Sequence, residues 1–288
     1  MDRPLLTVGI PTFNRAERLR SMLWSLAQQP IEGPGDVEFI VSDNCSTDHT
    51  SEVVAWAQQY MSVRYHRNSE NVGLMLNWRQ IAQNLARGEF CWTLGDDDIL
   101  RSNALERMCG VIRSQPDIDC FIVNYNHVST RYRKPGLTAD SDYDPGASLF
   151  TRDLSERRLE RWEDMISLAE NCTVYTYIGS QVVRTSALSR ISRTKSDGPW
   201  YASIEDTFPH VVAAARHMVG KPAYYIGDPQ IVVFHGEQEW GGDMAPLAGD
   251  DTPPDIRHVR GPGRRSVGHS PLPRSHFPRL GSPFLVPS

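Results

Sequence analysis

No apolar run in this 288-residue chain reaches the roughly 18 residues that a membrane-spanning helix needs. Cysteine is also scarce: there are five, an odd number, widely spaced and without a CxxC pair. That pattern argues against a disulfide framework and against a zinc site, and it predicts reduced thiols. The formal net charge of −5 argues against nucleic acid as the main partner, because nucleic-acid binding usually needs a basic surface.

The first residues, MDRPLLTVGIPTF, lack the apolar core of a signal peptide, because they reach a turn too early. We therefore expect a cytoplasmic protein. The segment from Pro246 to Ser288 holds nine of the chain's 20 prolines, mixed with Gly, Ser and Arg. Its composition predicts a disordered tail, or an extended arm that packs on a partner subunit.

Short β-branched runs alternate with amphipathic segments over the first 125 residues. Such alternation predicts parallel strands in an α/β sheet that helices cover on both faces. The expected strands are 5–10, 37–43, 63–66, 89–94 and 119–126, and the expected helices are 14–29, about 48–60, 74–88 and 103–115.

The pattern is less regular after residue 126. We expect a long loop at 130–147, a helix at 154–171 and a strand at 175–184. A further helix lies within 203–218, and Pro209 requires its regular part to begin near that residue. One or two short strands are expected within 223–235.

Polar clusters follow three of the predicted strands, namely PTFNR, SDNCSTD and GDDD. Ligands of open α/β sheets bind beyond the carboxyl ends of the strands, so the three clusters predict one binding edge. In the first cluster, Pro11 and Thr12 shape a turn whose N–H groups can meet a nucleotide. In the second, one carboxylate of Asp43 and Asp48 can accept from a base or ribose while the other caps a helix.

Asp96, Asp97 and Asp98 stand side by side in the third cluster. Adjacent carboxylates repel each other by about 1 kcal/mol or more near a protein surface. A hard divalent cation such as Mg²⁺ or Mn²⁺, which takes oxygen ligands from carboxylates and substrate phosphates, would offset that repulsion. The alternative is a capping cluster, with Asp98 or Asn103 capping the following helix.

Four stretches match one family in order and spacing: IPTFNRAERLRSMLWSL, VSDNCSTDHT, NVGLMLNW and GEFCWTLGDDDIL. The chain resembles the nucleotide-sugar-dependent glycosyltransferases of family 2, closely over 5–125 and more loosely over 175–235. It looks most like the bacterial branch that adds sugars to surface polysaccharides or glycolipids. The resemblance implies the GT-A fold, an α/β fold with a mostly parallel central sheet.

The resemblance also implies one transferase domain, 1–245, and a separate tail, 246–288. The nucleotide-binding half would be 1–126 and the acceptor half 127–245. Family members of this kind invert the anomeric centre and use a divalent cation, Mn²⁺ or Mg²⁺. By resemblance, the nucleotide-sugar contacts are Pro11, Thr12, Arg15, Asp43 (toward the base), Asn71 and Gly73.

The aspartate cluster occupies the family's DxD position, with a register open by one residue. The family often reads Asp-x-Asp-Asp, and here Gly95 replaces the first Asp. That register assigns the ribose to Asp96 and the metal to Asp97. Asp98 is a second candidate metal ligand, or it serves the next helix.

The pair Glu205-Asp206 matches the motif whose second carboxylate is the general base, which takes the proton of the acceptor hydroxyl as it attacks. The alternative for the pair is an N-terminal helix cap. His235 is either an additional metal ligand or a polar residue at a strand end. Trp240 is either part of a mobile lid or an exposed loop residue, and Arg184 meets an anion or is a surface charge.

The expected donor is a UDP-, dTDP- or GDP-linked sugar, and the expected acceptor is a saccharide or glycolipid. The resemblance also allows peripheral contact with the inner face of a membrane. Two alternatives stay open. A non-catalytic nucleotide-sugar binding module would fit the irregular tail, because relatives usually continue with helices. A nucleotidylyltransferase would need a Gly-rich, basic first loop, and GIPTFNRAER has only Gly9 there.

Overall fold

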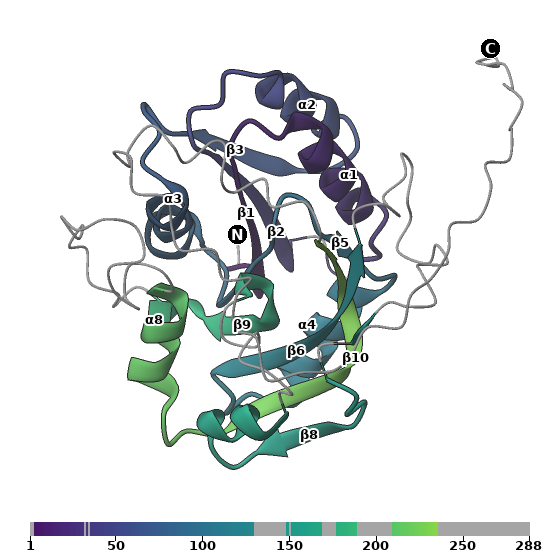
Figure 1. The fold of residues 1–288 in the computed structure, drawn as a ribbon, viewed down its shortest axis with the longest axis vertical. Helices are drawn as coiled ribbons and strands as arrows, with labels where there is room; N and C mark the ends of the chain where they lie inside the picture. Colours follow the sequence, from purple (N-terminus) through teal and green to yellow (C-terminus); the bar gives the residue numbers. More distant parts are fainter. Residues whose placement is uncertain are drawn as a thin grey trace, which may run out of the picture. The chain divides into compact units, whose positions relative to one another are not determined.

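A computed structural model describes residues 3–31, 33, 35–129, 148–149, 151–168, 177–188 and 209–235. Their strands form one mixed sheet with helices packed around it (Figure 1). The strands are β1 (Leu6–Thr12), β2 (Val37–Asp43), β3 (Val63–Arg67), β4 (Phe90–Thr93), β5 (Ile99–Leu100), β6 (Cys120–Ser129), β7 (Ser148–Leu149), β8 (Glu156–Leu159), β9 (Gln181–Arg184) and β10 (Ala223–His235).

The helical elements include several short ones in the second half of the chain. They are α1 (Ala16–Ala27), α2 (Thr50–Ala57), α3 (Leu74–Gln80), the π-helical turn η1 (Ile81–Leu85), α4 (Ala104–Ser114), the 3₁₀ helices η3 (Trp162–Leu168) and η4 (Ile178–Ser180), α6 (Thr185–Leu188) and α8 (Pro209–Met218).

The strand order in the sheet is β3-β2-β1-β4-β9-β6-β10-β5, with β7 beside β6 and β8 beside β10. The adjacent strands β3, β2, β1 and β4 run parallel to one another, and β6 and β10 are also parallel. Strand β9 is antiparallel to both β4 and β6 and lies between them. The alternating pattern therefore predicted the parallel pairs of the first half, but the sheet as a whole is mixed.

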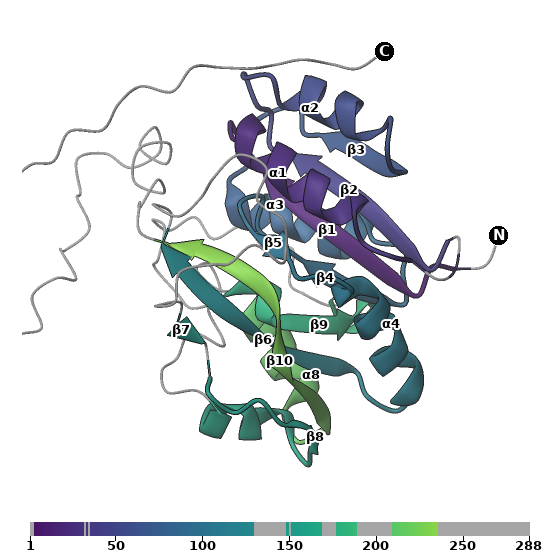
Figure 2. The same cartoon turned by 90° about the vertical axis from the view of Figure 1, so that its right-hand side faces the viewer.

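The sheet is covered on both faces where the first strands lie. Every residue of β1 is buried, as expected for a strand that helices cover on both sides. Figure 1 shows α1 and α3 on opposite sides of β1 and β2, and Figure 2 shows the same layers from the side. Helix α1 turns Leu19, Met22, Leu23 and Leu26 into the core at helical spacing, as its sequence predicts.

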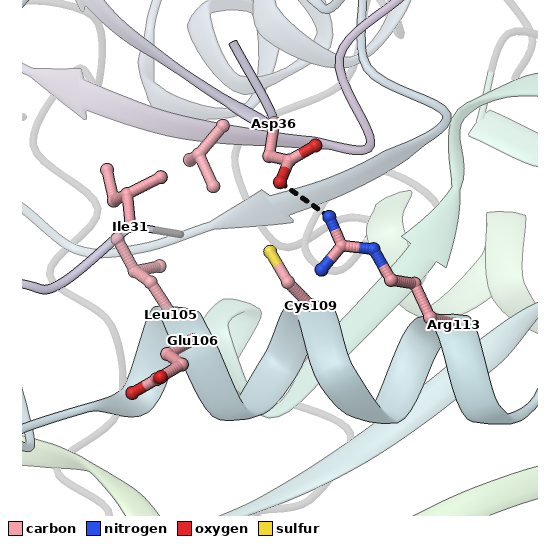
Figure 3. Close-up of a pocket in the computed structure, with 7 residues that line it drawn as sticks. Ile31, Asp36, Leu105, Glu106, Cys109 and Arg113 are labelled. Carbon is pink, nitrogen blue, oxygen red and sulfur yellow. Dashed lines mark hydrogen bonds and ion pairs between the residues drawn. The ribbon is translucent and has the colours of Figure 1, made fainter. Parts of the chain in front are cut away.

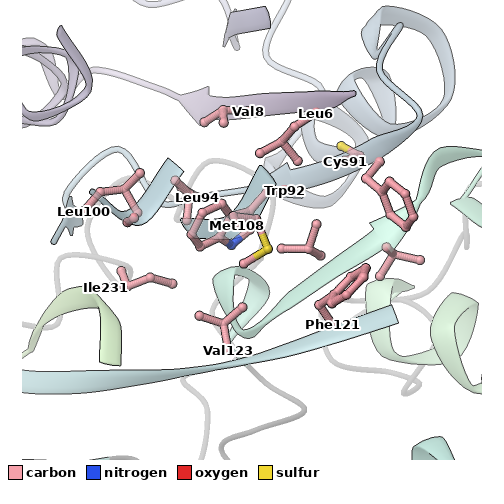
Figure 4. Packing of buried hydrophobic residues seen from close by; sticks show 14 of the residues in the cluster. Leu6, Val8, Cys91, Trp92, Leu94, Leu100, Met108, Phe121, Val123 and Ile231 are labelled. Carbon is pink, nitrogen blue, oxygen red and sulfur yellow. The ribbon is translucent and has the colours of Figure 1, made fainter. Parts of the chain in front are cut away.

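The core continues beneath the strand that leads to the aspartates. Trp92 on β4 is fully buried, and its Nε1 donates to the carbonyl oxygen of Gly179 at 2.8 Å. Figure 4 shows Trp92 and Leu94 packed among Met108, Leu100 and neighbouring apolar side chains. Because this strand is fixed on both faces, the loop that follows it starts from a rigid support.

Most expected elements of the first half are confirmed within one to three residues, and α8 begins at Pro209 as expected. The helix expected at 154–171 is wrong, because residues 156–159 form a strand on β10 and 162–168 form a 3₁₀ helix. Of the described part of the strand expected at 175–184, residues 178–180 form the 3₁₀ helix η4 and only 181–184 form a strand. The segment 223–235 is one long strand whose register shifts between Ile226 and Ile231.

Two further features bear on function. A small cavity between α4 and the chain before β2 is lined by Ile31, Leu105, Cys109 and the ion-paired Asp36 and Arg113 (Figure 3). Its volume of about 10 Å³ holds one water at most, so it cannot hold a nucleotide. Among the described residues, no helix combines the length and the apolar character needed to cross a bilayer.

Candidate functional site

The strand register brings the three polar clusters to one edge of the sheet. Thr12 at the end of β1 pairs with Asp43 at the end of β2. Gly9 pairs with Thr93 at the end of β4, and the Leu94 N–H then donates to the carbonyl oxygen of Gly9. The acid loop, residues 95–98, therefore emerges beside Thr12. The predicted convergence of the first, second and fourth strands is confirmed.

Asp96 turns inward and is held by the first loop. Thr12 Oγ1 donates to Asp96 Oδ2 at 2.8 Å, and Arg15 Nη1 donates to Asp96 Oδ1 at 3.1 Å. Asp96 is only 4% exposed. Two residues that the sequence assigned to the nucleotide, Thr12 and Arg15, are thus in direct contact with the aspartate assigned to the ribose.

Asp97 has a different environment, because its side chain is 22% exposed. Its Oδ2 lies 3.6 Å from Nη1 of Arg15 and 3.6 Å from Nη1 of Arg18. These are ion pairs at longer range than the hydrogen bonds of Asp96. Sequence reasoning missed Arg18. It lies three residues after Arg15, about one helical turn, and so shares the same side at the start of α1.

Asp98 is buried, and its side chain makes no capping hydrogen bond to α4. Its Oδ2 accepts from the Gly95 N–H at 2.9 Å and from the Tyr177 hydroxyl at 2.6 Å. The Asn103 side chain makes no capping hydrogen bond either. The expectation that one of these two side chains caps α4 is therefore wrong. Tyr177 was also missed, because it lies 79 residues from Asp98 in the chain.

Arg15 and Arg18 offset only part of the burial and mutual repulsion of the three carboxyl groups in the acid loop. Burial, together with the neighbouring Asp97 charge, raises the pKa of Asp96 to about 6. The same two causes raise the pKa of Asp98 to about 8. Burial and the Asp98 charge raise the pKa of Tyr177 well above its usual range, so its hydroxyl remains a donor. A ligand that brings positive charge would be favoured here.

Asp43 is almost fully buried and lies at the end of β2. Its Oδ1 accepts from the Ser46 N–H at 2.8 Å, and its Oδ2 accepts from the Tyr65 hydroxyl at 2.6 Å. Arg67 Nε lies 3.6 Å from Oδ2. Tyr65 and Arg67 on β3 were missed by sequence reasoning, although the pairing of Asp43 with Arg67 follows from parallel β2 and β3.

Asp48 is the capping carboxylate of the second cluster. Its Oδ2 accepts from the Ala16 N–H at 3.0 Å, and its Oδ1 accepts from the Thr50 N–H at 3.1 Å and from the Thr50 hydroxyl at 2.6 Å. One side chain thus satisfies free N–H groups at the starts of α1 and α2. The alternative in which Asp48 caps a helix is confirmed.

Asn71 and Gly73 lie beside the loop that follows β2. Asn71 Oδ1 accepts from Asn44 Nδ2 at 2.6 Å and from the Gly73 N–H at 2.9 Å. Gly73 has a φ of 85°, which side chains rarely adopt, so glycine is needed at this entry to α3. The contact joins this segment to Asn44, directly after Asp43.

The donor set fits a divalent cation only together with a substrate. No group of three or more His, Cys, Asp and Glu side chains gathers into a metal-binding cluster within the described ranges. Asp97 offers one partly exposed carboxylate, while Asp96 and Asp98 are buried and hydrogen-bonded. Mg²⁺ accepts one or two carboxylates plus phosphate oxygens, so a diphosphate would have to complete the site.

Several predicted site residues lie elsewhere or outside the described ranges. Glu205, Asp206 and Trp240 lie outside them, and His235 ends β10 with a side chain that is not described. Arg184 pairs with Phe90 at the start of β4, the sheet edge opposite the acid loop. Its guanidinium binds the carboxylates of Glu89 and Asp119. Arg184 therefore belongs to a group of ion pairs at the opposite end of β4 from the acid loop.

A larger groove of about 450 Å³ has a lining that includes no residue of the acid loop. It is lined by the start of α4 and the irregular part of β10, including Asn103, Arg107 and Asp228. Arg107 is itself ion-paired with Glu156 at 2.7 Å and with Asp228 at 3.5 Å. The groove shares none of the residues assigned to the nucleotide, so we place the site at the acid loop.

Comparisons with known proteins bear on the family and on the fold. A model of the family described as "Glycosyl transferase family 2" matches residues 7–191. The chain is 38% identical over 116 residues to abequosyltransferase RfbV of Salmonella typhimurium, covering 40% of this chain and 34% of that protein. It is 31% identical over 143 residues to GalNAc(5)-diNAcBac-PP-undecaprenol beta-1,3-glucosyltransferase of Campylobacter jejuni, covering 48% and 45%. The matches thus span less than half of these curated relatives.

Solved structures give the same fold at lower identity. TarS of S. aureus superposes with a TM-score of 0.57 at 20% identity, covering 80% of this chain and 36% of that one. Its 1–349 fragment, solved in complex with UDP-GlcNAc, gives a TM-score of 0.58 at 18% identity, covering 81% and 59%. The likeness confirms the GT-A type of α/β fold that the sequence predicted.

Proposed function

Because this chain belongs to glycosyl transferase family 2, we propose that it moves a sugar from a nucleoside diphosphate donor to a hydroxyl group of an acceptor. The observation that carries the proposal is the acid loop. The first loop supplies Thr12 and Arg15 to a buried Asp96, and Asp43 ends the neighbouring strand at the same edge. Nucleotides bind at this edge in open α/β sheets.

We assign the nucleotide to the loops after β1, β2 and β4. Asp43 and its neighbours Tyr65 and Arg67 face the base, and Asp96 accepts from the ribose. Asp43 is buried and accepts one hydrogen bond on each oxygen, from the Ser46 N–H and the Tyr65 hydroxyl, so each oxygen keeps a further lone pair for the base. Pro11 on β1 pairs with Ser42 on β2, one residue before each strand ends. This pairing sets the spacing of the two loops that follow.

We assign the diphosphate to the outer part of the acid loop. Asp97 would hold the divalent cation, Mn²⁺ or Mg²⁺, with phosphate oxygens as its other ligands. The cation, when bound, stabilises the negative charge that develops on the departing diphosphate. Arg15 and Arg18, which reach Asp97 at 3.6 Å, are placed to contact the same phosphates.

The proposed mechanism is inverting, with Asp206 as the general base. A carboxylate on the face opposite the leaving group takes the proton of the acceptor hydroxyl as it attacks the anomeric carbon. Glu205 adjoins it, and His235 is the candidate for an additional ligand. The motif match in the sequence supports these three assignments. The proposed acceptor is a saccharide or glycolipid, and a relative whose name contains a PP-undecaprenol acceptor supports the glycolipid.

The test is calorimetry of the full chain with UDP, dTDP and GDP, each with Mn²⁺ and each with EDTA. We expect at least one nucleotide to bind in Mn²⁺, and to bind about tenfold more weakly in EDTA. Asp97→Asn should reduce binding in Mn²⁺ to the EDTA level. Absence of binding to all three nucleotides in Mn²⁺ would refute the proposal.

Transfer is tested separately, with the sugar conjugate of the nucleotide that binds best. Asp206→Asn should retain donor binding and lose transfer to the acceptor. Transfer by this variant would show that Asp206 is not the base. Binding without transfer by the wild-type chain to any saccharide or glycolipid would favour a binding module instead.

A further inference from the structure

Asp98 and Tyr177 form a partly buried contact between two distant parts of the chain. The Tyr177 hydroxyl donates to Asp98 Oδ2 at 2.6 Å, and the Gly95 N–H donates to the same oxygen at 2.9 Å. The Asp98 N–H also donates to the carbonyl oxygen of Gly95 at 3.3 Å. Hydrogen bonds between Gly95 and Asp98 therefore close the acid loop, and the Tyr177 hydroxyl holds it from a distant part of the chain.

Tyr177 is itself held firmly. Its ring packs against Tyr125, with centroids 4.7 Å apart, and Tyr125 is fully buried on β6. Two residues later, the carbonyl oxygen of Gly179 accepts from Trp92 on β4. The segment 177–180 is therefore attached both to β6 and to the strand that carries the acid loop, so it is a fixed support for Asp98.

Asp97 and Asp98 are coupled through Gly95. A Cβ atom built on Gly95 would lie 2.7 Å from Asp98 Oδ2 and 2.9 Å from Asp97 Oδ1. Both carboxylates therefore lie against the same bare backbone position. If Asp98 lost its support and moved, it would move into the space that sets the position of the Asp97 carboxylate.

We propose that Tyr177 and Asp98 are positioning residues, which hold the acid loop so that the Asp97 carboxylate stays presented to a cation and diphosphate. Asp98 then acts through Asp97 and is not itself a metal ligand. The role of Asp97 in this inference rests on the proposed function. The hydrogen bond between Tyr177 and Asp98 involves no nucleotide, so it can be tested without one.

The test exploits the fact that one oxygen of Asp98 accepts both hydrogen bonds. In Asp98→Asn, the amide oxygen can accept from Gly95 and Tyr177 as before, while the side chain can no longer ionise. Tyr177→Phe removes only the hydroxyl, and Asp98→Ala removes the acceptor. The matched control is Tyr225→Phe, which removes a hydroxyl bonded at 2.5 Å to the carbonyl oxygen of Asp153, from a fully buried tyrosine elsewhere on the sheet.

The first measurement is hydrogen–deuterium exchange of the peptide spanning residues 89–100, without ligand. We expect exchange of the acid-loop amides to rise about tenfold in Tyr177→Phe and Asp98→Ala, because the loop loses one or both of its closing bonds. Asp98→Asn and Tyr225→Phe should exchange at the wild-type rate. Wild-type exchange in Tyr177→Phe would overturn the proposal.

The second measurement is Mn²⁺ binding in the presence of UDP, dTDP or GDP, followed by electron paramagnetic resonance of free Mn²⁺. We expect about tenfold weaker binding in Tyr177→Phe and near wild-type binding in Asp98→Asn. If Asp98→Asn loses Mn²⁺ as completely as Asp97→Asn does, Asp98 is a ligand and the proposal fails. If the wild-type chain binds no nucleotide, the proposed function fails, and loop exchange alone decides the positioning role.

Discussion

Replacing Thr12 with valine tests whether the buried Asp96 carboxylate depends on the hydroxyl that the first loop supplies. Valine has nearly the shape of threonine, so the change removes the 2.8 Å hydrogen bond to Asp96 Oδ2 and leaves no cavity. Thr12 and Asp96 are 3% and 4% exposed, so water cannot readily replace the missing donor. The loss should therefore appear directly in the free energy of unfolding.

The magnitude follows from the partners that remain. A hydrogen bond to a charged group contributes about 1.5–3 kcal/mol. Arg15 still donates to the other oxygen of Asp96 at 3.1 Å, so the carboxylate keeps one strong partner. We therefore expect Thr12→Val to lower the free energy of unfolding by about 2 kcal/mol, the lower half of that range.

The assay is urea unfolding followed by circular dichroism at pH 8, with EDTA present. At that pH Asp96 is ionised, because its pKa is about 6. Thr12→Ser is the matched control, since it keeps the hydroxyl and loses one buried methyl group, at a cost of about 1 kcal/mol. The reasoning is refuted if the valine variant is as stable as wild type, or if serine costs as much as valine.

Three further predictions concern the frame around the site. Asp48→Ala removes the carboxylate that caps α1 and α2, and should lower the free energy of unfolding at pH 7 by about 1–2 kcal/mol. Burial alone would raise the pKa of Asp48, but its hydrogen bonds to Thr50 and Ala16 lower it overall. The stabilisation by the Asp48 carboxylate is therefore present above its unfolded-state pKa, and it is lost as the pH falls through the lower folded-state pKa. If urea titrations gave the same difference between wild type and Asp48→Ala at all pH values, this reasoning would be contradicted. Gly73→Ala places a side chain at a φ of 85° and should cost about 1–2 kcal/mol in thermal unfolding, whereas an unchanged midpoint would mean that the loop relaxes. Arg184→Gln breaks ion pairs at the opposite sheet edge, and should cost about 1 kcal/mol while nucleotide affinity in calorimetry stays unchanged. Weakened nucleotide binding by this variant would show that Arg184 contributes to the nucleotide site.

The sequence predicted those parts of the site that depend on local pattern and on parallel strand ends. The strand 37–43 was predicted with its observed limits, and Asp43 follows from its last position. Asp48 could be read as a cap because it lies two residues before Thr50, the first residue of α2. The convergence of three loops needed only the rule that parallel strands end at one edge.

Contacts between residues far apart in the chain could not be predicted in that way. Tyr177 approaches Asp98 only because β9 inserts antiparallel between β4 and β6, which strand alternation does not encode. The segment 154–171 shows why a helical pattern misleads. Trp162, Met165 and Leu168 recur every three residues, which suits a 3₁₀ helix as well as an α-helix, and the preceding strand forms because β10 offers it an edge.

Gly95 explains how three adjacent carboxyl groups share one short loop. The family often has Asp at this position, yet any side chain here would meet the carboxylates of Asp97 and Asp98 within 3 Å. Without a side chain at 95, Asp98 can fold back onto the Gly95 N–H, and Asp96 can turn inward to Thr12. Each aspartate then has its own partners, which reduces the mutual repulsion. The glycine is therefore the condition for this arrangement, in which Asp96 is buried and Asp97 is partly exposed.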